Sequence, residues 1–245
     1  MHTIDATAYR RPGSLRVLAW FLSLLFIVPM LIGGKEFIID AFLDIPGEHR
    51  LTVSRVGDGL AYLLGVLLLL GMKKLWHKDL GAALRHEWGA RWPSLPMAYL
   101  IVAPAIAVSL IVLRLAVLPP VTEGPTMQML VTDFLVYLPA MIFAVLLVYG
   151  TLQHRWLDAP LWKNVLPVCL ILFLHPLVLL LPYIAPPDDP TLLGNALRND
   201  VYIAVAWTIN AGLAATLYWK TRSLSPVLAY FVLFDILIQI SGVIG

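Results

Sequence analysis

Residues 218–235 read YWKTRSLSPVLAYFVLFD, and this one stretch shows how the chain is built. We expect an apolar helix to end near Trp219, a short basic turn to follow, and a second apolar helix to begin near Pro226. One carboxylate, Asp235, lies inside that second apolar segment. Ionisable residues are rare and costly inside membrane-spanning segments, so each of them is a candidate functional residue.

The composition places the whole chain among membrane proteins. Of its 245 residues, 60% are hydrophobic and 13% are charged, and the mean hydropathy is +0.84. A soluble protein of this length could not cover so much apolar surface with polar groups. The single cysteine, Cys169, excludes an intrachain disulfide and a cysteine metal cluster. In its apolar surroundings we expect Cys169 to pack as a small hydrophobe.

Seven segments are apolar over roughly the 20 residues that a transmembrane helix needs. They are 15–33, 57–72, 97–118, 129–149, 164–185, 201–219 and 225–244. The amphipathic segment 36–47, EFIIDAFLDIPG, is either a helix on the membrane surface, which we favour, or an eighth, buried half-span. The predicted fold class is therefore all-α, a polytopic bundle of seven to eight transmembrane helices whose backbone polar groups are satisfied within each span.

Lysine and arginine positions indicate the orientation of the bundle. With the N-terminus inside, twelve basic residues are cytoplasmic and four are external, in agreement with the positive-inside rule. The cytoplasmic residues are Arg10, Arg11, Arg16, Lys73, Lys74, Lys78, Arg85, Arg91, Arg155, Lys163, Lys220 and Arg222, and the external residues are Lys35, Arg50, Arg55 and Arg198. No cleavage site follows the first apolar segment, so we expect it to be retained. We predict an integral protein of a bacterial cytoplasmic membrane.

The largest cytoplasmic segment, 73–96, alternates tryptophan with basic residues at helical spacing. Two interpretations are open for it. It could be a helix on an anionic lipid surface, or a solvated loop rimmed by interfacial aromatic residues.

His175 and Asp235 are the ionisable residues expected deepest in the membrane. They lie about eleven and about ten residues into their segments. At about 1.5 Å per residue both are roughly 15 Å deep and could meet. Such a pair could bind a metal, relay a proton or satisfy itself. Alternatively, His175 only bonds the backbone carbonyl that Pro176 leaves without a donor.

Other polar residues in the segments have structural interpretations. We expect Arg114 and Asp133 to form an ion pair near the outer leaflet, and Asn210 to join two helices by a hydrogen bond. The prolines that we expect to kink their helices are Pro104, Pro139 and Pro167.

Three stretches occur in a recognisable order: GTLQHRWL at 150–157, LILFLHP at 170–176, and the closing stretch at 218–235. Together they resemble the CAAX-protease and bacteriocin-processing (CPBP or Abi) family of polytopic intramembrane proteases, over roughly residues 129–240. The resemblance is most specific at GLAATLYWKTRSLSP, residues 212–226, where the family has a glycine-rich helix, a tyrosine, a Thr-Gly-Ser-Leu turn and a proline. It implies N-terminal helices and a basic loop in 1–128 and family core helices in 129–245.

The family's first polar motif is incomplete in this chain. That motif is two adjacent glutamates, three intervening residues and an arginine. Arg155 matches the arginine, while Gly150 and Thr151 occupy the glutamate positions. Glycine cannot take a proton, and a threonine hydroxyl is a poor general base without an activating partner.

The other two motifs match in one residue each. His175 matches the histidine of the second motif, with Ile171 at its phenylalanine position and Phe173 nearby. Asp235 matches the last residue of the third motif, and Phe231 replaces its histidine.

The resemblance implies an intramembrane endopeptidase, but the missing glutamates favour a non-proteolytic member. It would bind a membrane-embedded or prenylated peptide or protein, with His175, Asp235 and Arg155 lining a retained cavity. One alternative is an active endopeptidase that uses His175 and Asp235, with or without a metal. The position of His154 near the membrane surface argues against its binding the same metal ion. Another is a proton-coupled transporter. The expected partners are the lipid bilayer and such a peptide, with no nucleic acid and no cofactor.

Overall fold

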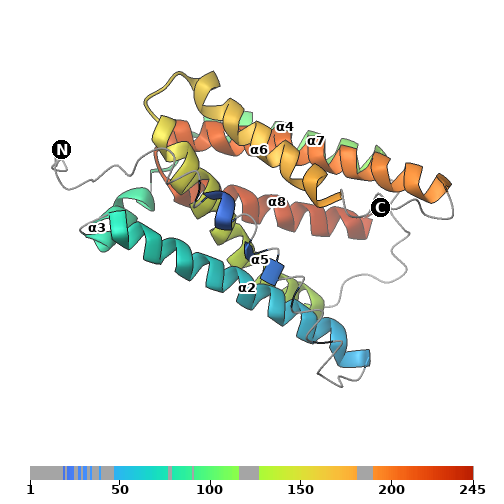
Figure 1. Ribbon diagram of the computed structural model, residues 1–245. Helices are drawn as coiled ribbons and strands as arrows, with labels where there is room; N and C mark the ends of the chain where they lie inside the picture. Colours follow the sequence, from blue (N-terminus) through green and yellow to red (C-terminus); the bar gives the residue numbers. More distant parts are fainter. Residues whose placement is uncertain are drawn as a thin grey trace. The chain divides into compact units, whose positions relative to one another are not determined.

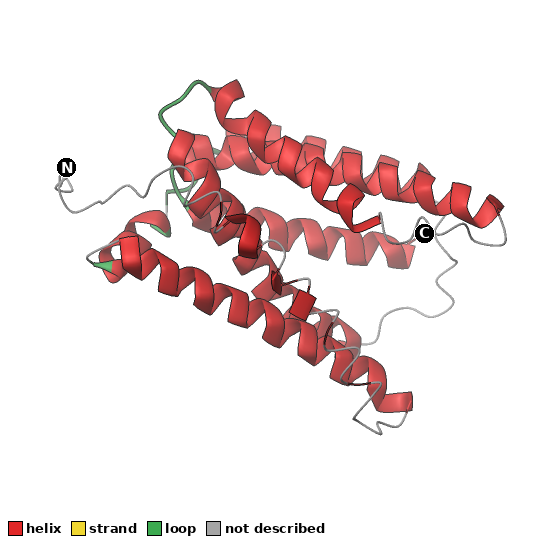
Figure 2. Cartoon of the chain, in the orientation of Figure 1, coloured by secondary structure: helices red, strands yellow, loops and turns green. Residues whose placement is uncertain are grey.

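The computed structural model of the chain describes residues 47–76, 79–89, 91–115, 127–180 and 190–244, together with scattered positions between 19 and 39. Every regular element in this part of the chain is helical (Figure 2). The predicted all-α fold class is therefore confirmed. The described positions within 15–33 are helical, whereas nearly all of the amphipathic segment 36–47 lies outside the described residues.

Each of the six predicted segments after residue 50 overlaps helices over the residues that the structure describes. The long helices are α2 (Gly47–Trp76), α4 (Leu95–Leu115), α5 (Met127–Ala144), α6 (Leu161–Leu180), α7 (Pro190–Thr221) and α8 (Leu224–Ile244). α7 is longer than its predicted segment and includes Arg198 and Asp200, which we expected in a loop. It begins at Pro190, whose fixed φ suits the first turn of a helix. Helix length follows backbone hydrogen bonding and caps, so it can exceed the apolar segment that predicts it.

Among the described residues, two helical stretches are long and apolar enough to cross a bilayer. They are Thr52–Leu75 and Val136–Trp156. Three shorter apolar stretches, Leu95–Val108, Leu161–Phe173 and Leu224–Phe234, lie in other helices of the described chain. The total of seven or eight spans and their orientation stay predictions.

The chain divides into two compact units. Unit 1 comprises Met1–Gly89 and Pro125–His154, and unit 2 comprises Ala90–Gly124 and Arg155–Gly245. In unit 1, α5 packs against α2, and in unit 2, α7 packs against α4, α6 and α8 (Figure 1). The predicted division after residue 128 follows a family resemblance rather than contacts, and it stays a prediction.

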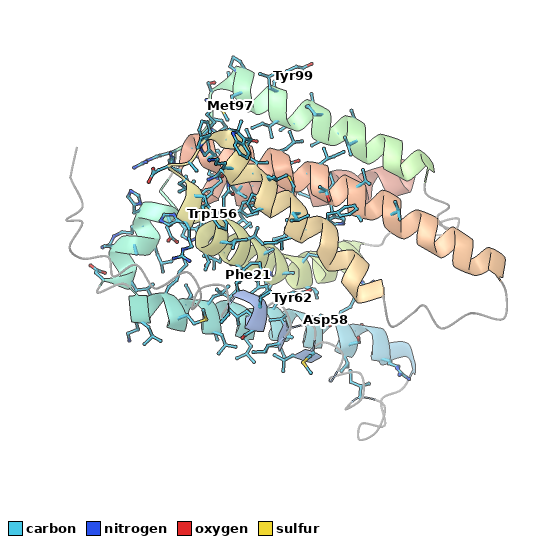
Figure 3. The ribbon with its side chains drawn as sticks, turned by 45° about the horizontal axis from the view of Figure 1, so that its top comes forward. Phe21, Asp58, Tyr62, Met97, Tyr99 and Trp156 are labelled. Carbon is cyan, nitrogen blue, oxygen red and sulfur yellow. The ribbon has the colours of Figure 1, made fainter. Side chains whose placement is uncertain are left out.

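In unit 1, α2 and α5 approach closely at Gly65. A Cβ atom at this position would lie 2.8 Å from Phe143 Cε2 and 2.8 Å from Val28 Cγ2. The Phe143 ring also packs on Tyr62, with ring centroids 6.1 Å apart. Tyr62 and Asp58 lie on the same helix, one turn apart (Figure 3). Glycine is needed at position 65 because any side chain would overlap the phenylalanine ring.

In unit 2, α6 and α7 meet at Gly212 and Cys169. A Cβ atom at position 212 would lie 3.0 Å from Cys169 Sγ. The thiol also lies 3.7 Å from the carbonyl oxygen of Thr208. Cys169 therefore packs between two helices, as predicted.

The helix–turn–helix predicted for residues 218–235 is confirmed. α7 ends at Thr221, and the next residue, Arg222, has a φ of 55° and an N–H that donates to the Tyr218 carbonyl over 2.8 Å. This left-handed cap is usually made by glycine. α8 begins two residues later, with Pro226 in its first turn.

Candidate functional site

A buried ion pair lies in unit 1, at the ends of two helices. Lys73 is in the last turn of α2, and Glu87 is the last residue of α3 (Leu80–Glu87). Lys73 Nζ donates to Glu87 Oε1 over 2.7 Å, to Glu87 Oε2 over 2.6 Å, and to the Gly150 carbonyl over 3.1 Å. Lys73 is 2% exposed and Glu87 is 4% exposed. The three protons of the ammonium therefore all have acceptors, which is what allows the charge to be buried.

The short helix α3 brings the glutamate back to the end of α2. Asp79 caps its start, since the carboxylate accepts from the Ala82 N–H over 2.9 Å. Its last turn closes with a hydrogen bond from the Trp88 N–H to the Leu84 carbonyl over 2.8 Å. Aspartate is among the preferred N-cap residues because it satisfies a backbone donor that has no partner within the helix.

The carbonyl that Lys73 bonds belongs to a π-helix. This element, η2 (Val145–Leu152), continues α5, and all eight of its residues are buried. Helices of this kind are rare and frequently occur at functional sites. The Thr151 hydroxyl donates to the Leu146 carbonyl over 2.9 Å, five residues back. At the C-terminal end of η2 the Lys73 ammonium satisfies a carbonyl and complements the negative end of the helix dipole.

The two residues that the resemblance places at the family's glutamate positions are thus both in η2. Gly150 and Thr151 are buried, and their carbonyl and hydroxyl oxygens make the hydrogen bonds described above. Arg155, the third residue of that motif, is half-buried in the following 3-10 helix η3 (Gln153–Trp156). His154 is also half-buried there.

His175 and Asp235 belong to α6 and α8, both helices of unit 2. Their side chains lie outside the described part of the chain, so their pairing stays a prediction. The same holds for the side chains of Arg114 and Asp133. Phe231, at the family's histidine position, is 8% exposed and packs edge-on against Tyr230, with ring centroids 5.6 Å apart.

Unit 2 has a neutral buried polar contact between α7 and α8. The Tyr230 hydroxyl donates to Asn210 Oδ1, and Asn210 Nδ2 donates to the Ala206 carbonyl over 2.9 Å. Asn210 is fully buried. The Tyr230 ring stacks on Phe234, with centroids 6.4 Å apart. The prediction that Asn210 joins two helices is confirmed.

Sequence reasoning missed the ion pair. Lys73 was expected at the start of the cytoplasmic segment 73–96, as part of a surface helix or a solvated loop. It lies instead in the last turn of α2 and is buried, because α2 continues beyond the apolar segment that predicts it. The solvated-loop interpretation of 73–96 is also wrong for residues 80–87, which form α3. The available signal was weak: Glu87 is the only carboxylate between residues 80 and 122.

Within the described residues, no three His, Cys, Asp or Glu side chains are grouped so that they could hold a metal ion. Since the side chains of His175 and Asp235 are not among them, the metal hypothesis stays a hypothesis. Comparisons of the chain with protein-family models, with characterised proteins and with solved structures find no match. The family resemblance therefore rests on the motifs quoted above.

Proposed function

We propose that this chain is a polytopic membrane protein with a CPBP-like scaffold that binds a peptide or protein segment without cleaving it. The scaffold has seven or eight spans, and its N-terminus is on the cytoplasmic side of a bacterial membrane. The ligand is a membrane-embedded or prenylated peptide or protein. His175, Asp235 and Arg155 line the cavity that receives it.

One observation carries the non-proteolytic part of this proposal. Hydrolysis would need a general base at positions 150 and 151, where the family has glutamates. In this chain the Gly150 carbonyl accepts from the Lys73 ammonium, and the Thr151 hydroxyl donates to a backbone carbonyl. Both residues are buried and hydrogen-bonded within unit 1, which is typical of residues that stabilise a fold. Neither of them offers a carboxylate that could activate water.

The Glu87 carboxylate lies near Gly150, because both bind the Lys73 ammonium, but this ammonium already balances its charge. Both of its oxygens accept from Lys73. A general base must be within hydrogen-bond reach of the water that it activates, and here both carboxylate oxygens face the Lys73 ammonium, at 2.7 and 2.6 Å. The contact therefore supports a structural role for Glu87 and favours binding over catalysis.

The surface of α2 supports the membrane location. Large apolar side chains at spacings of mostly three and four residues are exposed along this helix. They are Val53, Val56, Leu60, Leu63, Leu64, Leu67, Leu68 and Leu75. Contiguous apolar surface of this kind is unfavourable in water, by about 25 cal/mol for each Å², but it is compatible with lipid. In a membrane the same stripe would face acyl chains.

The first test is cleavage by the purified protein. A fluorogenic peptide with a farnesylated C-terminus is incubated with the native chain and with a variant that carries Gly150→Glu, Thr151→Glu and Phe231→His. We expect no cleavage by the native chain, and cleavage by the variant if the scaffold is protease-like. Cleavage by the native chain that disappears in His175→Ala would overturn the non-proteolytic proposal.

The second test is binding. The full chain in lipid nanodiscs is titrated with the same peptide, labelled and made uncleavable, and with its unprenylated counterpart as the control. We expect saturable binding of the farnesylated peptide, weakened at least tenfold in Asp235→Leu, a loss of roughly 1.4 kcal/mol. Equal binding of both peptides, or binding unchanged in Asp235→Leu and His175→Ala, contradicts the proposed cavity.

The topology is tested separately through cysteine labelling. The chain has one cysteine, so Cys169→Ser provides a cysteine-free background. Single cysteines at position 10 and at position 188 should react with a membrane-impermeant maleimide from opposite sides of the membrane. Labelling of both from the same side would exclude the proposed orientation.

A further inference from the structure

One end of unit 2 gathers positive charge where α7 ends and α6 begins. The Trp219 indole N–H donates to the Ala159 carbonyl over 3.1 Å, and Arg222 Nη1 lies 3.4 Å from Asp158 Oδ1. These contacts join the segment before α6 to the end of α7 (Figure 1). We use the name basic corner for the three cations of these two helix ends, Lys163, Lys220 and Arg222.

Two of these cations are held over tryptophan rings. Lys163 Nζ lies 5.1 Å from the centroid of Trp162, and Lys220 Nζ lies 4.9 Å from the centroid of Trp219. Both lysines are exposed. A cation over an indole face is positioned without using its N–H groups on a carboxylate, so these groups can donate to an anion. Tryptophan with lysine or arginine is also the pairing typical of the membrane–water interface.

Arg222 occupies its position at a conformational cost. Its φ of 55° is in the left-handed region, which is unfavourable for any residue with a Cβ and which glycine adopts freely. The ion pair with Asp158 does not explain why an arginine occupies this strained position. The Asp158 side chain is 94% exposed, and exposed ion pairs contribute little to stability. Strained residues cluster at functional sites. The Arg222 guanidinium has a planar fork of donors that suits phosphate oxygens.

An apolar stripe leads away from the basic corner along α6. Its members, Trp162, Leu166 and Leu170, are spaced by four residues and are 63%, 60% and 55% exposed. A ligand that matches both features has an anionic head and a long apolar tail. The basic corner has three cations, and one of them, Arg222, is paired with a carboxylate, so the charge balance favours an anionic ligand over a zwitterionic one.

We propose that the basic corner binds the phosphate headgroup of an anionic phospholipid, whose acyl chain lies along Trp162, Leu166 and Leu170. All three cations belong to segments that the sequence places on the cytoplasmic side, where anionic lipids give the leaflet a negative surface potential. The inference rests on the proposed membrane location but not on the family resemblance.

The test measures lipid binding to the full chain purified in detergent. Native mass spectrometry counts the adducts formed with phosphatidylglycerol and with phosphatidylcholine of the same acyl chains. We expect phosphatidylglycerol to be preferred, and the preference to fall about fivefold for each cation removed. The variants are Arg222→Gly and the pair Lys163→Gln with Lys220→Gln. Arg50→Gln, an exposed arginine of α2 that the sequence places on the external side, is the matched control for net charge and should keep the preference.

Arg222→Gly separates binding from folding, because it relieves the left-handed strain and should not lower the unfolding temperature. Equal adducts with both lipids overturn the proposal, as does a preference that survives in both variants or is lost equally in Arg50→Gln. Displacement of the lipid by soluble glycerol phosphate at equal concentration also overturns it, since the site would then be one for a free phosphate. If the chain stays in the membrane fraction but shows no lipid preference, only the lipid site is contradicted. If the chain is recovered in the soluble fraction, the proposed membrane location is contradicted as well.

Discussion

Each of the two compact units buries a polar contact between helices, but the contact is ionic in unit 1 and neutral in unit 2. Lys73 and Glu87 place two opposite charges where less than 5% of either residue is exposed. Asn210 and Tyr230 make a single uncharged side-chain hydrogen bond. Removing an ion from water is far more costly than removing an amide or a hydroxyl, and the cost is offset only while both partners are present. Unit 1 should therefore be much more sensitive than unit 2 to the loss of one partner.

The largest effect is expected for Lys73→Met. This change leaves Glu87 buried without its counter-charge and the Gly150 carbonyl without its donor, and it should lower the free energy of unfolding by about 3–5 kcal/mol. Unfolding in sodium dodecyl sulfate, followed by tryptophan fluorescence, measures the loss. The double variant Lys73→Met with Glu87→Leu should recover most of it, because no buried charge remains. A double variant as unstable as the sum of the two single changes would contradict this explanation.

The next effect tests close packing rather than charge. Gly65→Ala should destabilise the protein by roughly 1–3 kcal/mol, because the new methyl group would overlap the Phe143 ring and Val28. Gly71→Ala in the same helix is the control, since no atom lies within 4 Å of a Cβ built there. It should stabilise by about 0.5–1 kcal/mol, the usual gain from replacing a helical glycine. The same unfolding assay compares them, and two changes of the same sign would rule out the close approach.

Tyr230→Phe tests the neutral contact in unit 2. It removes the hydroxyl and leaves Asn210 Oδ1 without this donor, so we expect a loss of about 1 kcal/mol. A double-mutant cycle with Asn210→Ala should give a coupling near 0.6 kcal/mol, the average for such contacts in membrane proteins. A coupling as large as that between Lys73 and Glu87 would contradict the expectation that the neutral contact contributes less to stability than the ion pair.

The smallest effect is expected for Arg222→Gly. The left-handed conformation costs a residue with a Cβ about 1–2 kcal/mol, and glycine avoids this cost. Glycine also makes the unfolded chain more flexible, which lowers the stability of the folded state by about 0.4–1 kcal/mol. The net gain should be about 0.5 to 1 kcal/mol, seen as a higher midpoint in the same unfolding assay. Arg222→Ala retains the strain and removes only the guanidinium, so it should show no gain. A gain of the same size in both variants would mean that the strain is not the cause.

The positions of the helices followed well from hydropathy. The predicted segment 225–244 and α8 differ by one residue at their start, and 129–149 lies within α5 and η2 together. The helix ends were harder to predict. Lys73 lies beyond the apolar run of its segment yet still within α2, because a helix continues until its backbone is capped. The π-helix was not predicted either, since a widened turn has no distinct pattern of apolar residues.

Little of the candidate site could be predicted. Gly150 and Thr151 were singled out by their order along the chain, but their contacts were not predicted, and the roles of Arg155, His175 and Asp235 stay predictions. The turn at residues 221–224 was expected from its composition, whereas the left-handed conformation of Arg222 was not, because glycine is the usual residue there.

The sequence by itself determined the helical class and the approximate place of each long helix from α2 to α8. Long apolar segments must satisfy their own backbone hydrogen bonds, and a helix is the local structure that does so. Only the tertiary structure decided that Lys73 bonds both Glu87 and the Gly150 carbonyl, which are 14 and 77 residues away along the chain. Such a contact depends on where α2 ends, how α3 folds back and how α5 widens into η2. Local periodicity carries no information about these three features, and burial makes the contact decisive because it removes the water that would otherwise screen the charges.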